Sequence, residues 1–237
     1  YYIDGKFNLN NNQNLDDTAD EFNTKLGLSN EKFTIANGVT VSSATGKGLS
    51  MASHDDVVDN TTTGYTNNGT VNITGGTPSK TTALSTSFGY VNNKGTISVD
   101  KGIGAYGING ARIENNSDIV IGSDGAALYS TGVNGSLKNN GKLTLGKNSV
   151  GMFMKDGTAL INIGEIVSTE AGAKGLVVSN TTASVYANNG KIKLDGTSSI
   201  GIHAEGAAHT IISAADVEVG DTTGTDQSVA IHLKDGG

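Results

Sequence analysis

The sequence predicts an all-β chain folded as a right-handed parallel β-helix, or β-solenoid, with three short strands in each coil of about 24 residues. The first observation is composition: 34 of 237 residues are Gly, and there are 1 Pro, no Cys and no Trp. The second is a turn residue followed by alternating apolar residues, which recurs along the chain. The third is that two further apolar runs keep a constant order between these recurrences.

The first run follows a turn Gly or Ser and alternates apolar and polar residues. From residue 69 to residue 216 its copies are separated by 26, 22, 24, 23, 26 and 26 residues, and earlier copies begin at Gly5 and Gly38. Alternation with period two sends one set of side chains inward. The residues expected to form one buried column are Ile97, Ile119, Leu143, Ile166, Ile192 and Val217.

The second run is a small residue followed by an apolar one. Its copies are Gly48-Leu49, Ala83-Leu84, Gly107-Ile108, Ala127-Leu128, Gly151-Met152, Gly175-Leu176, Gly201-Ile202 and Ala230-Ile231. The third run precedes the turn, and its copies are Phe33-Thr34-Ile35, Tyr90-Val91, Ile113, Leu137, Leu160-Ile161, Val185-Tyr186 and Ile211-Ile212. One coil cannot bury its own inner face, but stacked coils can, with each strand paired in parallel to its counterpart in the next coil.

Asn-Gly or Asn-Asn-Gly turns stand at 37–38, 67–69, 139–141 and 188–190. Asn and Gly tolerate the left-handed backbone of a sharp corner. Asn at one position in successive coils can also stack its amides in a hydrogen-bonded ladder. The alternative is a β-hairpin turn, but a meander would not keep three distinct elements in order over so many units.

We expect residues 1–237 to be a single β-helix segment cut from a longer chain, because repeat elements reach both ends. Residues 10–30 interrupt the repeat with a short helical insertion near the N-terminus, since Leu15, Ala19, Phe22 and Leu26 fall at helical spacing before Gly27. Residues 52–64 and 74–82 are loop insertions. Insertions in solenoids collect on one face and often supply contacts.

Charge and composition exclude several classes of function. Lys and Arg number 16 against 23 Asp and Glu, and Arg112 is the single Arg, so we expect no nucleic-acid partner. No apolar run approaches 18 residues, so the segment is not expected to span a membrane as a helix. Thiolate metal sites are excluded because there is no Cys, and no phosphate loop precedes a helix. We therefore expect no cofactor.

The sequence contains few groups of residues that could form a catalytic or metal site. Asp55, Asp56 and Asp59 lie in one loop with His54, and we interpret them as a solvated acidic loop, with a cation site or a catalytic role as alternatives. No Ser-His-Asp arrangement is evident. His203 and His232 share a repeat position and are expected to stack if their coils are neighbours, without a third ligand for a metal. We expect no catalytic, cofactor-binding or metal-binding residue, and no enzyme activity.

The position that His203 and His232 share follows an inward apolar residue, so its side chains should point outward. In chain order the position contains Ser50, Ser85, Asn109, Tyr129, Phe153, Val177, His203 and His232. Tyr129, Phe153 and Val177 would then form an exposed apolar ladder. Such a row marks a contact surface, or it packs beneath an insertion.

One repeat consists of Gly146–Met152, Gly157–Asn162 and Gly164–Ile166. It resembles a repeat in the passenger domains of large, monomeric type V autotransporter adhesins of Gram-negative bacteria, and the resemblance covers about residues 33–237. The resemblance implies a monomeric, surface-exposed passenger, anchored to the outer membrane through a C-terminal barrel that this chain does not contain. It also implies adhesion to a host-cell receptor or glycan, or to another bacterial surface. It carries over no specific binding residue.

We therefore expect a segment of a surface adhesin that acts as a rigid stalk and displays loops, with contacts favoured at 52–64 and 74–82. One alternative is a β-helical carbohydrate-active enzyme, either a polysaccharide lyase or a glycoside hydrolase. Another is a phage tail spike or fibre segment, which would be a trimer.

Overall fold

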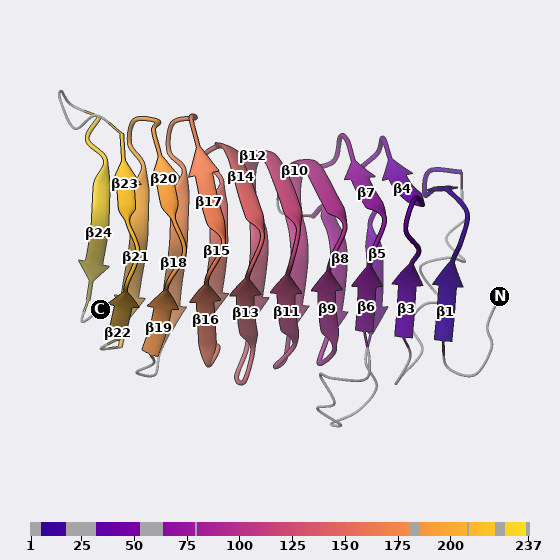
Figure 1. The fold of residues 1–237 in the computed structure, drawn as a ribbon, viewed down its shortest axis with the longest axis horizontal. Coiled ribbons are helices and arrows are strands. Elements are labelled where there is room, and N and C mark those ends of the chain that lie inside the picture. Colours follow the sequence, from indigo (N-terminus) through magenta and orange to yellow (C-terminus); the bar gives the residue numbers. More distant parts are fainter. Residues whose placement is uncertain are drawn as a thin grey trace.

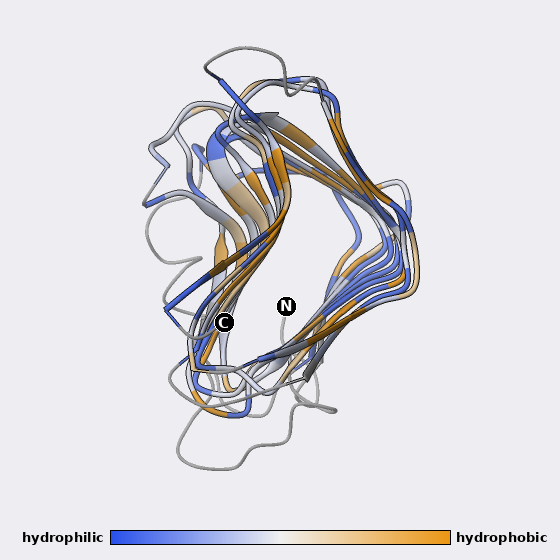
Figure 2. Ribbon diagram, turned by 90° about the vertical axis from the view of Figure 1, so that its left-hand side faces the viewer, coloured by the Kyte–Doolittle hydropathy of each residue, from blue (hydrophilic) through white to orange (hydrophobic). Residues whose placement is uncertain are grey.

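The protein is a β-solenoid, as predicted (Figure 1). The computed structural model describes residues 6–17, 32–52, 64–78, 80–180, 185–207, 209–220 and 226–235. Its strands stack in parallel, so that each strand pairs with its counterpart in the next coil. Viewed along the stack, the coils superimpose on a three-sided outline (Figure 2). We call the sides the first, second and third faces, in the order in which the chain passes through them.

The first face is a nine-stranded sheet. Its strands are β1 (Lys6–Leu9), β3 (Lys32–Ile35), β6 (Gly64–Asn67), β9 (Tyr90–Asn93), β11 (Arg112–Asn115), β13 (Ser136–Asn139), β16 (Ala159–Asn162), β19 (Val185–Asn188) and β22 (Thr210–Ser213).

The second and third faces share two long strands, β10 (Thr96–Ile108) and β12 (Asp118–Thr131), each of which turns a corner between them. The other strands of the second face are β2 (Gln13–Asn14), β4 (Thr40–Ser43), β7 (Thr70–Ile73), β14 (Lys142–Lys147), β17 (Glu165–Ser168), β20 (Ile192–Leu194) and β23 (Val217–Val219). The other strands of the third face are β5 (Leu49–Ala52), β8 (Thr82–Ser87), β15 (Val150–Lys155), β18 (Lys174–Asn180), β21 (Ile200–Gly206) and β24 (Val229–Lys234).

The predicted core column is confirmed on the second face. Ile97 pairs with Ile119, and the pairing continues through Leu143, Ile166 and Ile192 to Val217. The first five of these side chains are fully buried, whereas Val217 in the last described coil is only partly buried. The inward apolar positions of all three faces therefore meet in one continuous core.

A second buried column consists of asparagines at the ends of the first-face strands. Its members are Asn67, Asn93, Asn115, Asn139, Asn162 and Asn188. Each side-chain amide donates to the Oδ1 of the next residue over 2.7–2.9 Å, and Asn188 donates to Ser213 Oγ over 3.2 Å. The predicted amide ladder is thus present, and it satisfies polar groups that are fully buried.

The turn glycines serve a different purpose from the one predicted. Gly95, Gly141, Gly164 and Gly190 do not have positive φ angles, although Gly38 does. A Cβ at Gly141 would lie 2.0 Å from the carbonyl oxygen of Ser117 in the preceding coil, and the other three glycines are equally close to theirs. These positions favour Gly because the backbones of successive coils approach closely, not because the corner is left-handed.

The first part of the predicted helical insertion at 10–30 is not helical. Residues 13–14 form β2, and Leu15 is buried with its N–H donating to Ser42 O over 2.8 Å. Leu15 thus belongs to the parallel stack. Its hydrogen bond to the next coil outweighs the preference for a helix that the apolar spacing indicated. Residues 18–31 and most of the 52–64 insertion lie outside the described residues. Within the described part of the chain, no helix long and apolar enough to cross a membrane occurs.

One repeat assignment on the third face is wrong. Leu84 pairs with Ala105, and Ala105 pairs with Leu128, so the small–apolar pair of this coil is Gly104-Ala105 rather than Gly107-Ile108. Ile108 lies three residues later, at the end of β10, and is partly exposed. The register follows the continuous β10 strand, whereas the sequence pattern favoured the larger apolar residue.

Candidate functional site

The outward row of the third face is the candidate site. Its pairings are Ser50–Ser85, Ser85–Tyr106, Tyr106–Tyr129, Tyr129–Phe153, Phe153–Val177, Val177–His203 and His203–His232. The register correction places Tyr106, not Asn109, in this row. Three consecutive coils thus contribute an aromatic ring each, and we call Tyr106, Tyr129 and Phe153 the aromatic ladder.

The rings of the aromatic ladder are in direct contact. The Tyr106 and Tyr129 centroids lie 5.1 Å apart with an interplanar angle of 67°. The Tyr129 and Phe153 centroids lie 4.6 Å apart, and these rings are stacked at 9°. Both arrangements are favourable for aromatic pairs. All three side chains remain partly exposed, so the ladder offers aromatic surface to solvent.

Val177 does not extend this surface. The sequence predicts it as an exposed member of the row, but its exposed fraction is 6%. The short Val side chain lies between Phe153 and His203, its neighbours in the row. The apolar part of the row that a partner could touch therefore ends at Phe153.

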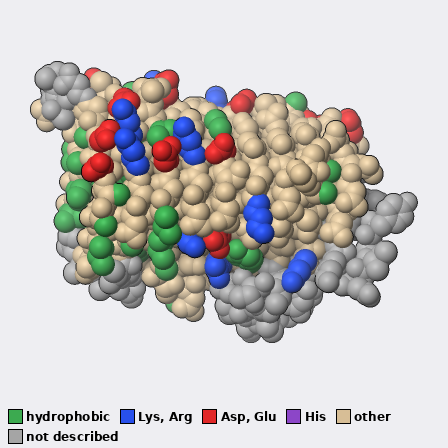
Figure 3. Space-filling model, viewed as in Figure 1, with side chains coloured by type: hydrophobic (Ala, Val, Ile, Leu, Met, Phe, Trp, Pro, Cys, Tyr) green, Lys and Arg blue, Asp and Glu red, His purple; other side chains and the backbone are tan. Residues whose placement is uncertain are grey.

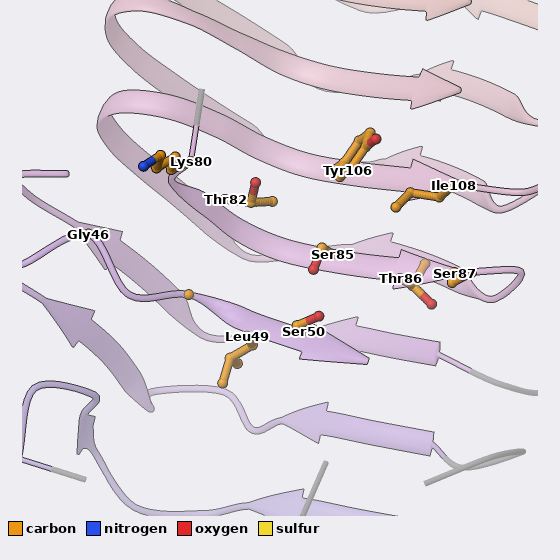
Figure 4. A pocket seen from close by; sticks show the side chains of 11 residues that line it. Gly46, Leu49, Ser50, Lys80, Thr82, Ser85, Thr86, Ser87, Tyr106 and Ile108 are labelled. Atoms are coloured by element: carbon orange, nitrogen blue, oxygen red, sulfur yellow. The ribbon is translucent and has the colours of Figure 1, made fainter. Parts of the chain in front are cut away.

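Two shallow depressions adjoin the aromatic ladder, and Thr82 and Tyr106 line both. The first has a volume of about 370 Å³. Figure 4 shows Ser50, Ser85 and Tyr106 projecting into this region from three successive strands of the third face. The second has a volume of about 400 Å³ and is lined by Tyr106, Tyr129 and Phe153 among others. The two depressions adjoin along the solenoid axis, with Thr82 and Tyr106 between them, and we call them together the ladder groove.

The predicted insertion at 74–82 contributes to the wall of the ladder groove. Pro78 lines the second depression, Lys80 the first, and Thr82 both. Asp124 is the one carboxylate among the described residues that line either depression. Hydrogen bonds from Asn148 and Ser123 hold the pKa of Asp124 below its ordinary value, so it is ionised at neutral pH.

Hydroxyl groups supply most of the polar lining. Ser50, Ser85 and Ser87 line the first depression with Thr82. The Tyr106 hydroxyl lies 3.4 Å from Thr131 Oγ1. Burial raises the pKa of Tyr129, so its hydroxyl stays protonated at neutral pH. Each hydroxyl can both donate and accept a hydrogen bond.

The predicted histidine stack is present at the far end of the same row. The His203 and His232 ring centroids lie 4.9 Å apart, and their Nδ1 atoms are 2.9 Å apart. His203 Nε2 is also 3.6 Å from Glu205 Oε2. Burial lowers the pKa of His203 despite this carboxylate. No cluster of three or more metal-ligating side chains occurs in the described ranges. Asp55, Asp56 and Asp59 lie outside them.

Arg112 lies outward on the first face, as the sequence predicts, but its charge is already paired. Arg112 and Lys138 contact Glu114 at 3.0 and 3.3 Å, and the Tyr90 hydroxyl donates to Glu114 over 3.1 Å. Burial opposes ionisation of Glu114, but these hydrogen bonds outweigh it and hold its pKa below the ordinary value. The cluster links three neighbouring coils, and Glu114 is held by partners within the protein.

Charged side chains also gather on the second face towards the C-terminal end, where Figure 3 shows Lys and acidic residues intermixed. Lys142 lies 3.9 Å from Glu165, and Lys191 lies 3.0 Å from Glu218. These exposed pairs join neighbouring coils and alternate in sign. At this end of the second face the described charges are therefore of both signs, and the aromatic ladder on the third face is the more distinctive surface.

In comparisons with protein-family models, curated proteins and solved structures, no match to the chain was found. The site therefore rests on its own geometry. Sequence reasoning identified Tyr129 and Phe153 but missed Tyr106. The signal that could have found it is its place 23 residues before Tyr129, close to the repeat length.

Proposed function

We propose that this chain is a surface-exposed binding segment of an adhesin, in which the solenoid is a rigid support and the ladder groove contacts the partner. The observation that carries the proposal is the row of contacting, partly exposed rings of Tyr106, Tyr129 and Phe153. Contiguous exposed apolar surface beside polar groups is typical of interaction sites.

The backbone beneath the ladder favours a binding role. β10, β12 and β15 each pair with a strand on both sides, so the three rings stand on a sheet that is continuous along the axis. A site on regular strands needs little ordering when a partner binds. The loop insertions favoured by the sequence would be a secondary contact, through Pro78 and Lys80 at the edge of the groove.

Binding is favoured over the alternative of carbohydrate hydrolysis. Glycoside hydrolysis ordinarily uses two carboxyl groups, one of them with a raised pKa. Among the described residues that line the ladder groove, Asp124 is the one carboxylate, and its pKa is lowered. The resemblance to autotransporter passenger domains supports placement at a bacterial surface and attachment to host cells or other bacteria.

The test is an adhesion assay with beads that carry the 237-residue chain, applied to cultured epithelial cells and to bacteria. In the triple variant Tyr106→Thr, Tyr129→Thr and Phe153→Thr, the rings are removed but a β-branched residue remains at each strand position. We expect adhesion to fall to the level of bare beads. Loss of the two ring pairs should also cost about 1–3 kcal/mol of stability, so adhesion is compared at a temperature at which circular dichroism shows the variant to be folded. Tyr90→Thr, which removes an outward ring from the first face, is the matched control and should adhere normally. Equal adhesion by the triple variant would refute the role of the groove.

A further inference from the structure

The aromatic ladder repeats along the solenoid axis at the spacing of the coils. Successive ring centroids lie 5.1 and 4.6 Å apart, close to the distance between neighbouring strands. The hydroxyls of Ser50 and Ser85 continue the same row on the N-terminal side. A ligand that uses the whole row must therefore be extended and must offer apolar surface and polar groups repeatedly along its length.

The backbone of the third face excludes strand addition along the groove. Peptides that bind by β-augmentation need an unpaired strand edge. β5, β8, β10, β12 and β15 follow one another in unbroken parallel pairing across the ladder groove. Their N–H and C=O groups are used between coils, so only side chains face the ligand. A bound peptide would lose the hydration of its own backbone without a matching set of partners.

The charge of the ladder groove is small and balanced. Lys80 and Asp124 are the ionisable lining residues of the two depressions besides tyrosine. Recognition of a polyanion would need several Lys or Arg side chains, and these are not present among the lining residues that the structure describes. A ligand with little net charge fits the groove better than an acidic polymer.

We propose that the ladder groove binds an unbranched, uncharged oligosaccharide that lies along the solenoid axis. The inference rests on the proposed adhesive function and names its ligand class. The C–H groups of successive sugar rings would pack against the exposed edges of the Tyr106, Tyr129 and Phe153 rings, because the faces of Tyr129 and Phe153 are stacked on one another. Sugar hydroxyls would exchange hydrogen bonds with Tyr129, Ser85 and Thr82, because protein hydroxyls both donate and accept.

The first experiment is binding of the 237-residue chain to an array of immobilised neutral and anionic oligosaccharides, followed by calorimetry with the linear neutral glycan that binds best. Tyr129→Thr should weaken this binding by about tenfold or more, since aromatic anchors dominate such interfaces. Tyr129→Phe should weaken it only a few-fold because the ring remains. Tyr90→Thr should have no effect. The affinity should change little between about 0.05 and about 0.5 M NaCl, because few charges take part.

The second experiment separates this inference from the proposed function. Target cells are treated with periodate, which cleaves vicinal diols of sugars, or with protease, before the bead assay. Loss of adhesion after periodate but not after protease is expected. A second outcome is that adhesion still depends on the aromatic ladder but survives periodate and is lost after protease. This outcome would refute the oligosaccharide ligand and leave the proposed adhesive function intact. Binding on the array restricted to anionic glycans would also overturn it. Adhesion that does not depend on the ladder would refute both.

Discussion

Replacement of Asn139 by Ala should destabilise the solenoid far more than replacement of a nearby exposed asparagine. Asn139 is fully buried in the asparagine ladder. It accepts a hydrogen bond from Asn115 over 2.9 Å and donates to Asn162 Oδ1 over 2.8 Å and to Gly141 O over 3.1 Å. The substitution removes all three bonds and leaves groups of both neighbouring asparagines with fewer partners.

The magnitude follows from these orphaned groups. Leaving one buried polar group without a partner costs about 1–3 kcal/mol. Asn115 Nδ2 keeps its bond to Ser117 O over 2.6 Å, whereas Asn162 Oδ1 loses its donor from the ladder. The shorter Ala side chain also leaves a cavity, which adds to the cost of the unpartnered groups. We therefore expect a loss of about 2–5 kcal/mol in the free energy of unfolding.

The assay is urea denaturation followed by circular dichroism, with hydrogen exchange to localise the effect. Exchange should accelerate most at β11, β13 and β16, the strands that carry these three asparagines. Asn116→Ala is the matched control. Asn116 is exposed and also bonds to two asparagines, Asn92 over 3.0 Å and Asn140 over 2.7 Å. Water can replace those bonds, so the control should cost about 0.5 kcal/mol or less. Equal losses for the two variants would refute the reasoning.

Four further predictions follow from the core, a corner and two titrating sites. Leu143→Ala should cost about 2–5 kcal/mol in denaturant unfolding, because Leu143 is fully buried between Ile119 and Ile166; a neutral result would contradict the inward register. Gly141→Ala should cost about 1–3 kcal/mol by the same assay, because its Cβ would lie 2.0 Å from Ser117 O. Burial lowers the pKa of His203, so on acidification the unfolded chain takes up a proton at a higher pH than the folded chain does, and the free energy of unfolding should fall as the pH drops below about 6.5. Hydrogen exchange at β24, corrected for intrinsic rates, should become faster over this range. His203→Gln should weaken this pH dependence. Hydrogen bonds from Thr45, Ser43 and Ala44 lower the pKa of Asp16 to about 2. The stabilisation of β4 by these bonds should be complete above about pH 4 and should be lost as the pH falls towards 2, which would appear as faster hydrogen exchange in β4. Asp16→Asn should abolish this acid-dependent change in exchange.

Sequence by itself determined the repeat, the class of fold and most inward positions. Period-two alternation and a repeat length of about 24 residues can both be read from the sequence alone. Ile119, Leu143 and Ile166 could therefore be assigned to one column before any contact was known. The amide ladder was also predictable, since Asn recurs at one place beside the turn. Tyr129 and Phe153 could be assigned to the outer row for the same reason.

Only the tertiary structure decided the features that depend on a neighbouring coil. Tyr106 joins the aromatic ladder because β10 continues unbroken into the third face and sets the register through Ala105, whose small side chain gave little hydrophobic signal. The turn positions need Gly because a Cβ there would collide with a carbonyl oxygen of the preceding coil, and not because of their φ angles. Val177 is covered although alternation points it outward. A pattern along the chain reports the direction of a side chain, whereas its exposure and its partners depend on the side chains above and below it in the stack.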